Sequence, residues 1–153
     1  MIDLSNAFFS VPLEKDSQYW FAFTFEGQRY TFTRLPQGYA ESPTIFSEAI
    51  SNCLADFNPP EGSQILVYVD DILVVSKEKQ ACKTDSIALL EYLAKTGHKV
   101  NKNKLQLWQQ EVKYLGHTLT HEGRRVNDDR KKSYSLCSPT SNKETDDVIL
   151  RTV

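Results

Sequence analysis

The stretch QILVYVDDILVV, residues 64–75, is the most apolar part of the chain, and two adjacent carboxylates interrupt it. Apolar and β-branched residues on both sides of Asp70 and Asp71 are typical of strands. Aspartate is common in tight turns, where solvent is at hand. The stretch therefore predicts two strands joined at the aspartate pair, and a hairpin tip is one explanation for that pair.

An amphipathic helix is expected on each side of this hairpin. Residues 42–57 repeat apolar side chains at three- and four-residue steps, after an N-capping Ser42 and Pro43 at the first helical position, and Pro59-Pro60 stop the pattern. The second helix is predicted from residue 79 to 96, with Gly97 as its C-terminal cap.

The rest of the first 126 residues is rich in strand patterns. Residues 18–25 and 29–34 flank Gly27 and predict a β-hairpin. Shorter strands are expected near residues 1–4, 98–101, 104–108 and 112–119. With the hairpin taken as an insertion, the order is β-α-β-β-α-β, which is the ferredoxin-like arrangement. We therefore predict an α+β domain in which two helices cover one face of an antiparallel sheet.

Composition places the chain among globular proteins. Its 153 residues are 40% hydrophobic and 25% charged, which suits one domain over residues 1–126. Its three cysteines are an odd number and follow no signal peptide, and no apolar run approaches the ~20 residues that cross a bilayer. We expect a soluble intracellular protein, cytoplasmic or nuclear, that is not secreted and has no membrane partner.

The last part of the sequence loses these patterns. Residues 127–153 contain mostly polar residues with no sustained period, so an irregular tail is expected. A reading frame of the coding sequence shifted by one base could encode a different segment after Lys131-Lys132, one that resembles the start of a thumb in the family named below. We therefore hypothesise that this tail is frameshifted.

The charge is unevenly divided along the chain. Residues 1–71 contain three basic and ten acidic side chains, whereas residues 72–153 contain fifteen basic and ten acidic ones. An acidic half favours metal ions and a lysine-rich half favours phosphates, although solvated surfaces often show such asymmetry.

Asp3, Asp70 and Asp71 all lie at the edge of apolar runs. Burying an ionised carboxylate costs several kcal/mol unless a counter-charge is present. Carboxylates that converge from neighbouring strands form an oxygen site suited to Mg²⁺. Two such ions about 4 Å apart can activate a hydroxyl and stabilise a leaving pyrophosphate.

The sequence resembles the reverse transcriptases of retroviruses and retrotransposons, of the endogenous-retrovirus pol type. The segments that carry the resemblance are IDLSNAFF (residues 2–9), LPQG (35–38) with Ser42-Pro43 and Phe46, YVDD (68–71), Gly97 to Lys104, and VKYLG (112–116). Five ordered segments are far more specific than a lone YVDD. The resemblance covers about residues 1–130 and implies a polymerase palm with part of the fingers, the hairpin being a fingers insertion.

This resemblance implies an RNA-directed DNA polymerase that joins a deoxynucleotide to a primer 3′-hydroxyl. Asp3, Asp70 and Asp71 would be catalytic and hold two Mg²⁺ ions, for which Mn²⁺ could substitute. Asp3 and Asp70 would be the main ligands, and Asp71 a weaker or structural one. Lys104 would give a proton to the leaving pyrophosphate. Phe8 would lie beneath the incoming sugar and exclude a 2′-hydroxyl, although such a residue is more often plain core.

The nucleotide and nucleic-acid contacts follow in the same way. Gln37 and Gly38 would line the nucleotide pocket, the alternative being an ordinary proline-glycine loop. The primer and template contacts would come from Tyr68, Val69, Tyr114, Leu115 and Gly116. The implied partners are an RNA or DNA template, a DNA primer and deoxynucleoside triphosphates.

In this family, further regions surround the part that the chain resembles. We expect the rest of the fingers before Asp3, and a thumb, a connection region and a ribonuclease H domain after it, all in a full-length polyprotein. The alternative function is a catalytically dead, truncated retroelement remnant that binds nucleic acid weakly. A separate RNA-recognition module is disfavoured because the basic-aromatic strand signature is missing.

Overall fold

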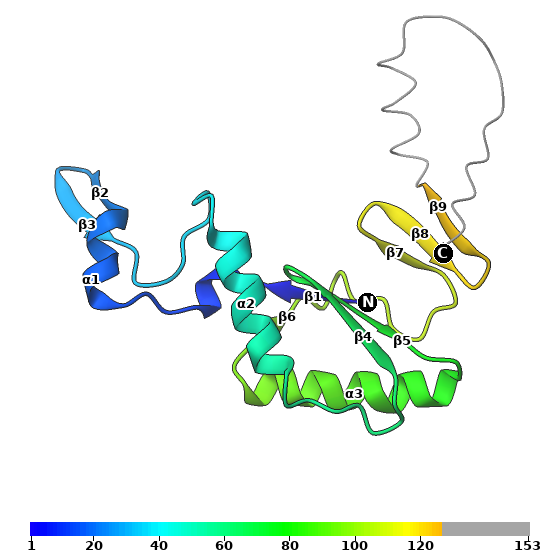
Figure 1. Ribbon diagram of the computed structural model, residues 1–153. Helices are drawn as coiled ribbons and strands as arrows, with labels where there is room; N and C mark the ends of the chain where they lie inside the picture. Colours follow the sequence, from blue (N-terminus) through cyan, green and yellow to red (C-terminus); the bar gives the residue numbers. More distant parts are fainter. Residues whose placement is uncertain (127–153) are drawn as a thin grey trace, which may run out of the picture.

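The computed structural model describes residues 1–126 and has a four-stranded antiparallel sheet at its centre (Figure 1). Its strands are β1 (Ile2–Ser5), β4 (Gln64–Tyr68), β5 (Asp71–Val75) and β6 (Lys99–Val100), in the spatial order β4-β5-β1-β6. The first strand in sequence is thus central, between the third and the fourth, which is the ferredoxin-like order. The predicted α+β fold is confirmed.

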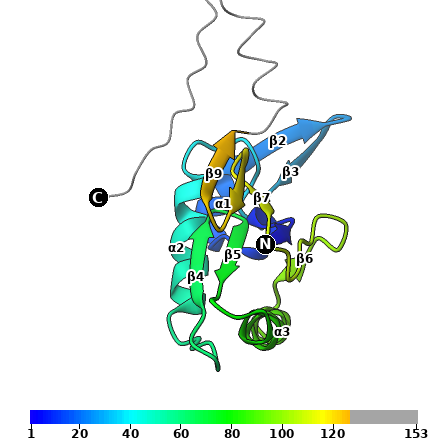
Figure 2. The same ribbon diagram turned by 90° about the vertical axis from the view of Figure 1, so that its right-hand side faces the viewer.

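Two helices cover one face of this sheet. Helix α2 (Ser42–Leu54) packs against β4, and α3 (Lys79–Lys95) packs against β5 and β6. Figure 2 views α3 along its axis, with β5 and β6 above it. Because side chains alternate along a strand, every second residue of β1 and β5 reaches these helices. The shared core contains Ile2, Leu4, Ile72 and Val74 from the sheet and Phe46, Ile50, Leu89 and Leu93 from the helices.

The predicted N-cap of α2 is wrong by one residue. Ser42 is the first helical residue, follows Glu41, and uses its buried Oγ to donate a hydrogen bond of 2.7 Å to the Pro36 carbonyl. A serine hydroxyl can satisfy a nearby carbonyl as readily as a helix N–H, so it ties the preceding loop to the helix. At the end of α3, Gly97 adopts a φ of 84° and confirms the predicted cap.

A hairpin projects from one side of the central body in Figure 1. Its strands β2 (Ala22–Phe25) and β3 (Gln28–Thr31) are joined by Glu26 and Gly27, both at positive φ, which is the primed turn expected of a two-residue loop. The predicted strands were too long. Before them, the chain forms short helical turns, η1 (Phe8–Ser10), α1 (Lys15–Gln18) and η2 (Tyr19–Phe21).

A three-stranded antiparallel sheet lies on the other side (Figure 1). It consists of β7 (Val112–Tyr114), β8 (His117–Thr120) and β9 (Gly123–Val126), so Leu115 and Gly116 divide the predicted strand 112–119. Both turn residues have positive φ, as the primed turn of a two-residue hairpin loop requires. The strand predicted at 104–108 is wrong, because this segment is irregular and starts with a turn in which the Lys104 N–H donates to Asn101.

Within residues 1–126, no helix has the length and apolar character needed to cross a bilayer. The predicted irregular tail, residues 127–153, and its frameshift hypothesis lie outside the described residues.

Asp85 of α3 anchors the loop that leads into β4. Its buried carboxylate accepts hydrogen bonds from the backbone N–H groups of Glu61, at 2.8 Å, and Ser63, at 2.9 Å, and from the Ser63 hydroxyl. Burial by itself raises the pKa of an aspartate, but these three donors favour the ionised form and lower the pKa of Asp85 below its ordinary value. The ionised carboxylate therefore stabilises the folded chain.

We expect Asp85→Asn to lower the free energy of unfolding at pH 7 by about 1–3 kcal/mol, because the amide NH₂ faces groups that are themselves donors. The pKa of Asp85 is lower in the folded chain than in the unfolded chain, where an aspartate has a pKa of about 3.9. Asp85 therefore stabilises the folded chain at pH values above the unfolded pKa, and this stabilisation is lost as the pH falls through the folded pKa. Urea denaturation at pH 7 and pH 3 should therefore show a smaller difference between variant and parent at pH 3. Asp56→Asn, at an exposed position, is the control; a difference that is equal at both pH values would contradict this role.

Candidate active site

Two carboxylates face each other across neighbouring strands of the central sheet. Asp3 of β1 is paired in register with Asp71 of β5, and Tyr68 of β4 is the partner of Asp71 on the other side. Paired residues of antiparallel strands project to the same face. Because the adjacent pair Ile2 and Ile72 belongs to the helix-covered core, these three side chains lie on the opposite face.

The turn between β4 and β5 places the third carboxylate. Val69 and Asp70 are its two residues, and Val69 has a φ of 50°, which a β-branched residue rarely adopts. The Leu4 N–H donates a hydrogen bond of 2.8 Å to the Asp70 carbonyl. This bond fixes the strained turn against β1, so that Asp70 is next to the pair formed by Asp3 and Asp71.

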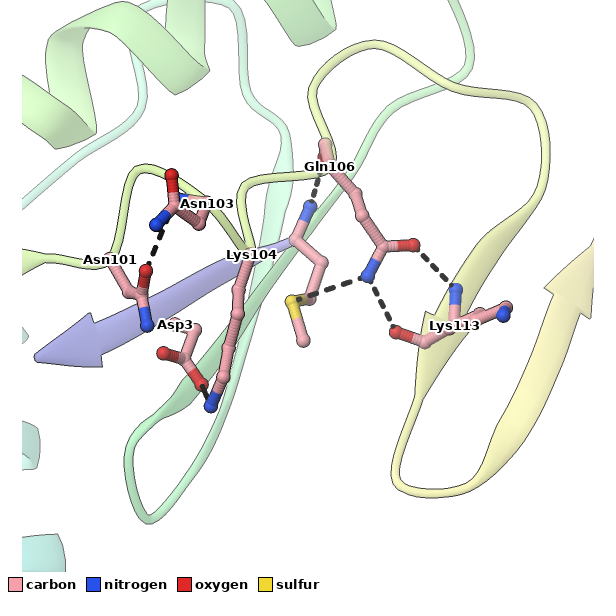
Figure 3. A network of polar contacts seen from close by, with 7 residues as sticks. Asp3, Asn101, Asn103, Lys104, Gln106 and Lys113 are labelled. Carbon is pink, nitrogen blue, oxygen red and sulfur yellow. Dashed lines mark hydrogen bonds and ion pairs between the residues drawn. The ribbon is translucent and has the colours of Figure 1, made fainter. Parts of the chain in front are cut away.

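The segment after β6 brings a cation to this face. The Asn101 N–H donates to the Asp3 carbonyl at 2.8 Å, and the Gln106 N–H donates to the Met1 carbonyl at 3.0 Å. The chain is thus held against β1 at two points and loops out between them. Figure 3 shows Lys104 reaching back from this loop, with its Nζ 3.1 Å from Asp3 Oδ2.

The charged side chains of the site shift one another's pKa values. Asp3 is only 6% exposed. Partial burial, followed by the charges of Asp70 and Asp3, raises the pKa of Asp71, and Lys104 opposes that rise. The hydrogen bond to Asp3 and the charge of that carboxylate raise the pKa of Lys104, so this lysine stays protonated at neutral pH.

A pocket of about 490 Å³ opens beside these groups. The turn after β7 forms its far wall. Partial burial, followed by the charges of Asp71 and Tyr68, raises the pKa of Tyr114. The lining residues are Met1, Asp3, Asp71, Asn103, Lys104, Leu105, Gln106, Lys113, Tyr114, Leu115 and Gly116. The structure therefore brings together six of the residues that the sequence singled out.

Three other predicted site residues, Phe8, Gln37 and Gly38, do not line this pocket. Phe8 is half-buried and packs edge-to-face on Phe46, with ring centroids 5.9 Å apart. Gln37 lines a second, larger pocket of about 750 Å³ beside the aromatic side chains of the hairpin region, and Gly38 follows it at a φ of 91°.

The donor set suits a hard divalent cation, although no cage is preformed. Among residues 1–126, no three Asp, Glu, His or Cys side chains are gathered closely enough to hold an ion together. Carboxylate oxygens are nevertheless the ligands that Mg²⁺ prefers. Burial, followed by the charges of Asp70 and Asp3, raises the pKa of Asp71, and a nearby divalent cation would favour the ionised carboxylates.

Sequence reasoning missed several residues of this site. The missed lining residues are Met1, Asn103, Leu105, Gln106 and Lys113. Asn103 and Lys113 lie in segments that carry the resemblance, whereas no local pattern distinguishes the other three from ordinary loop residues. Gln106 in particular lies in the segment predicted as a strand, and its contacts depend on residues distant in the sequence.

Comparison with known proteins shows which family the chain belongs to. The sequence profile of the family described as reverse transcriptase (RNA-dependent DNA polymerase) matches residues 1–119. The Gag-Pol polyprotein of Walleye dermal sarcoma virus is 55% identical over 135 residues, which are 88% of this chain and 8% of that polyprotein. The Gag-Pol polyprotein of Avian reticuloendotheliosis virus is 42% identical over 132 residues, 82% of this chain and 11% of the polyprotein. The chain thus spans about a tenth of these relatives.

Solved structures extend the likeness to the fold. The foamy viral protease-reverse transcriptase in complex with RNA/DNA hybrid has a TM-score of 0.77 and 36% identity over 90% of this chain and 18% of its own. The same type of protein in complex with double-stranded DNA has a TM-score of 0.79 and 34% identity over 91% of this chain and 24% of its own. The sequence profile, the related polyproteins and the fold agree, and the chain belongs to the reverse transcriptase family.

Proposed function

We propose that this chain carries the polymerase active site of an RNA-directed DNA polymerase. The observation that carries the proposal is the pairing of Asp3 with Asp71 at the mouth of a pocket that also contains Lys104 and the turn Tyr114–Gly116. The substrates would be a deoxynucleoside triphosphate, a DNA primer and an RNA or DNA template. Complexes of the related foamy viral proteins with RNA/DNA hybrid and with double-stranded DNA support the nucleic-acid partners.

Asp3, Asp70 and Asp71 would hold two Mg²⁺ ions, with Mn²⁺ able to substitute. When bound, the ions would lower the pKa of the primer 3′-hydroxyl and offset the charge on the pyrophosphate that leaves. The carboxylates would contribute by concentrating negative charge at one point of the sheet, where the ions would bind. The near-complete burial of Asp3 and the fixed turn at Asp70 support such preorganisation.

Lys104 would act as the general acid that protonates the leaving pyrophosphate. Its raised pKa keeps the proton available, and its side chain is 62% exposed at the pocket, so it can turn from Asp3 toward a ligand. A general acid contributes roughly 10²–10⁴-fold to rate. Lys104→Gln should therefore slow extension by that order while primer binding changes little.

The remaining predicted residues would contact substrate around this centre. Tyr68 is 57% exposed on the carboxylate face, next to Val69 in the turn, and would meet the primer end. The turn Tyr114–Gly116 would hold the primer strand. Phe8 would exclude a 2′-hydroxyl, and Gln37-Gly38 would contact the nucleotide or the template.

Extension of a labelled DNA primer on an RNA template, with Mg²⁺ or Mn²⁺, tests this proposal. We expect the purified chain to extend the primer and its Asp70→Asn variant to fail, with equal circular dichroism spectra. A DNA template in parallel measures template preference. No extension by the folded parent would contradict the proposal and favour the dead remnant, whose weak binding should survive Asp70→Asn and fade with salt.

A further inference from the structure

The side chain of Gln106 forms two hydrogen bonds with the backbone of a single residue of β7. Its Nε2 donates to the Lys113 carbonyl at 3.0 Å, and its Oε1 accepts from the Lys113 N–H at 2.8 Å (Figure 3). β7 is the edge strand of its sheet. The amide thus satisfies the two edge groups that a neighbouring strand would otherwise pair.

The backbone of the same residue pairs with Met1, which directly precedes β1. The Gln106 N–H donates to the Met1 carbonyl at 3.0 Å, and the Met1 nitrogen donates to the Gln106 carbonyl at 2.6 Å. Met1 is two residues from Asp3. Gln106 therefore has a two-point contact with the residue that leads into the carboxylate-bearing sheet and another with the sheet that carries the turn Tyr114–Gly116.

The two sheets share no strand. Their relative placement consequently depends on contacts between side chains and loops, and the pocket lies where they meet. The two hydrogen bonds fix the distance and the orientation of the Gln106 amide relative to the Lys113 backbone, because both bonds break if the amide rotates or slides.

We propose that Gln106 is a positioning residue that sets the turn Tyr114–Gly116 at a defined place relative to Asp3 and Asp71. This role rests on the proposed function, because a primer 3′ end that is held by the turn must lie close to the carboxylates to react. Small displacements of reacting groups cost large factors in rate. Gln106 acts through Lys113 and Met1 and need not touch the substrate.

Gln106→Leu, which keeps the size but removes both polar atoms, tests the contact directly. We expect amide hydrogen exchange at Lys113, followed by NMR, to become at least about tenfold faster, while the Leu4 amide is unchanged. Gln106→Glu keeps the acceptor but faces the Lys113 carbonyl with a second acceptor, so it should alter the NMR shifts of Tyr114–Gly116 without loss of folding. Gln110→Leu, at an exposed position of the same segment, is the matched control.

Primer-extension kinetics test the role in the reaction. For Gln106→Leu and Gln106→Glu, we expect the KM for primer–template to rise about tenfold and the KM for the nucleotide to stay within twofold, a split that a general loss of folded protein does not produce. Unchanged Lys113 exchange, or parent-like kinetics in an active chain, would overturn the proposal and leave the proposed function intact. If the parent extends no primer, the proposed function fails and this role fails with it, while exchange still reports whether Gln106 holds the turn.

Discussion

Asp3→Asn should lower the rate of primer extension at least about a thousandfold and leave the chain folded. Asp3 is the buried member of the carboxylate group and stands opposite Asp71 on the adjacent strand. Asparagine has the same shape but no charge, so a divalent cation would lose its most enclosed ligand. The fold should persist because the substitution also removes a negative charge that raises the pKa of Asp71. Lys104 would lose its charged partner but is mostly exposed.

Activity and metal binding should change together in this variant. We expect calorimetric titration to detect Mn²⁺ binding by the parent and a loss of at least about tenfold in affinity for Asp3→Asn. Mg²⁺ should raise the thermal midpoint of the parent by mass action and that of the variant much less. Asp16→Asn, in α1 at an exposed position, should match the parent. An Asp3→Asn variant with near-parent extension rates would contradict the assigned role of this carboxylate.

Phe46→Ala should lower the free energy of unfolding by about 3–5 kcal/mol. Phe46 is 0% exposed and joins α2 to the core beneath the sheet, with edge-to-face ring contacts to Phe8 and to His98, the latter with ring centroids 6.5 Å apart. Truncation to alanine leaves a cavity that close-packed neighbours fill only in part. Since ordinary domains have a stability of 5–15 kcal/mol, this one substitution removes a large share of it.

Urea denaturation followed by circular dichroism measures this loss. Phe25→Ala is the matched control, because Phe25 is 59% exposed in the hairpin and its truncation should change stability by no more than about 0.5 kcal/mol. Primer extension by Phe46→Ala should fall in proportion to the folded fraction. Equal stability of the two variants would show that α2 contributes little to the core.

The helices, the hairpins and the strand order follow closely from the sequence. The stretch at residues 64–75 forms two strands with a tight turn at Asp70, and Gly97 caps α3 as expected. These features were predictable because turn chemistry and hydrophobic periodicity are local properties of a chain. Two errors depend on other parts of the chain: Ser42 bonds the Pro36 carbonyl rather than a helix N–H, and residues 104–108 loop out where Gln106 pairs with the distant Met1.

The sequence also indicated three carboxylates that the fold brings close together, since ionised groups inside apolar runs require compensation. It could not indicate what compensates them. Lys104 reaches Asp3 across 101 residues of chain, and Gln106 pairs with Met1 across 105.

The sequence by itself thus determined the fold class, the family resemblance and the identity of the acidic residues. Only the tertiary structure decided that Asp3 faces Asp71, that Lys104 is their cation, and that Gln106 links the two sheets. Phe8 and Gln37 lie outside that pocket for the same reason. The strand register and the path of a loop are set by the packing of the whole domain, whereas periodicity and turn residues act over a few neighbouring positions.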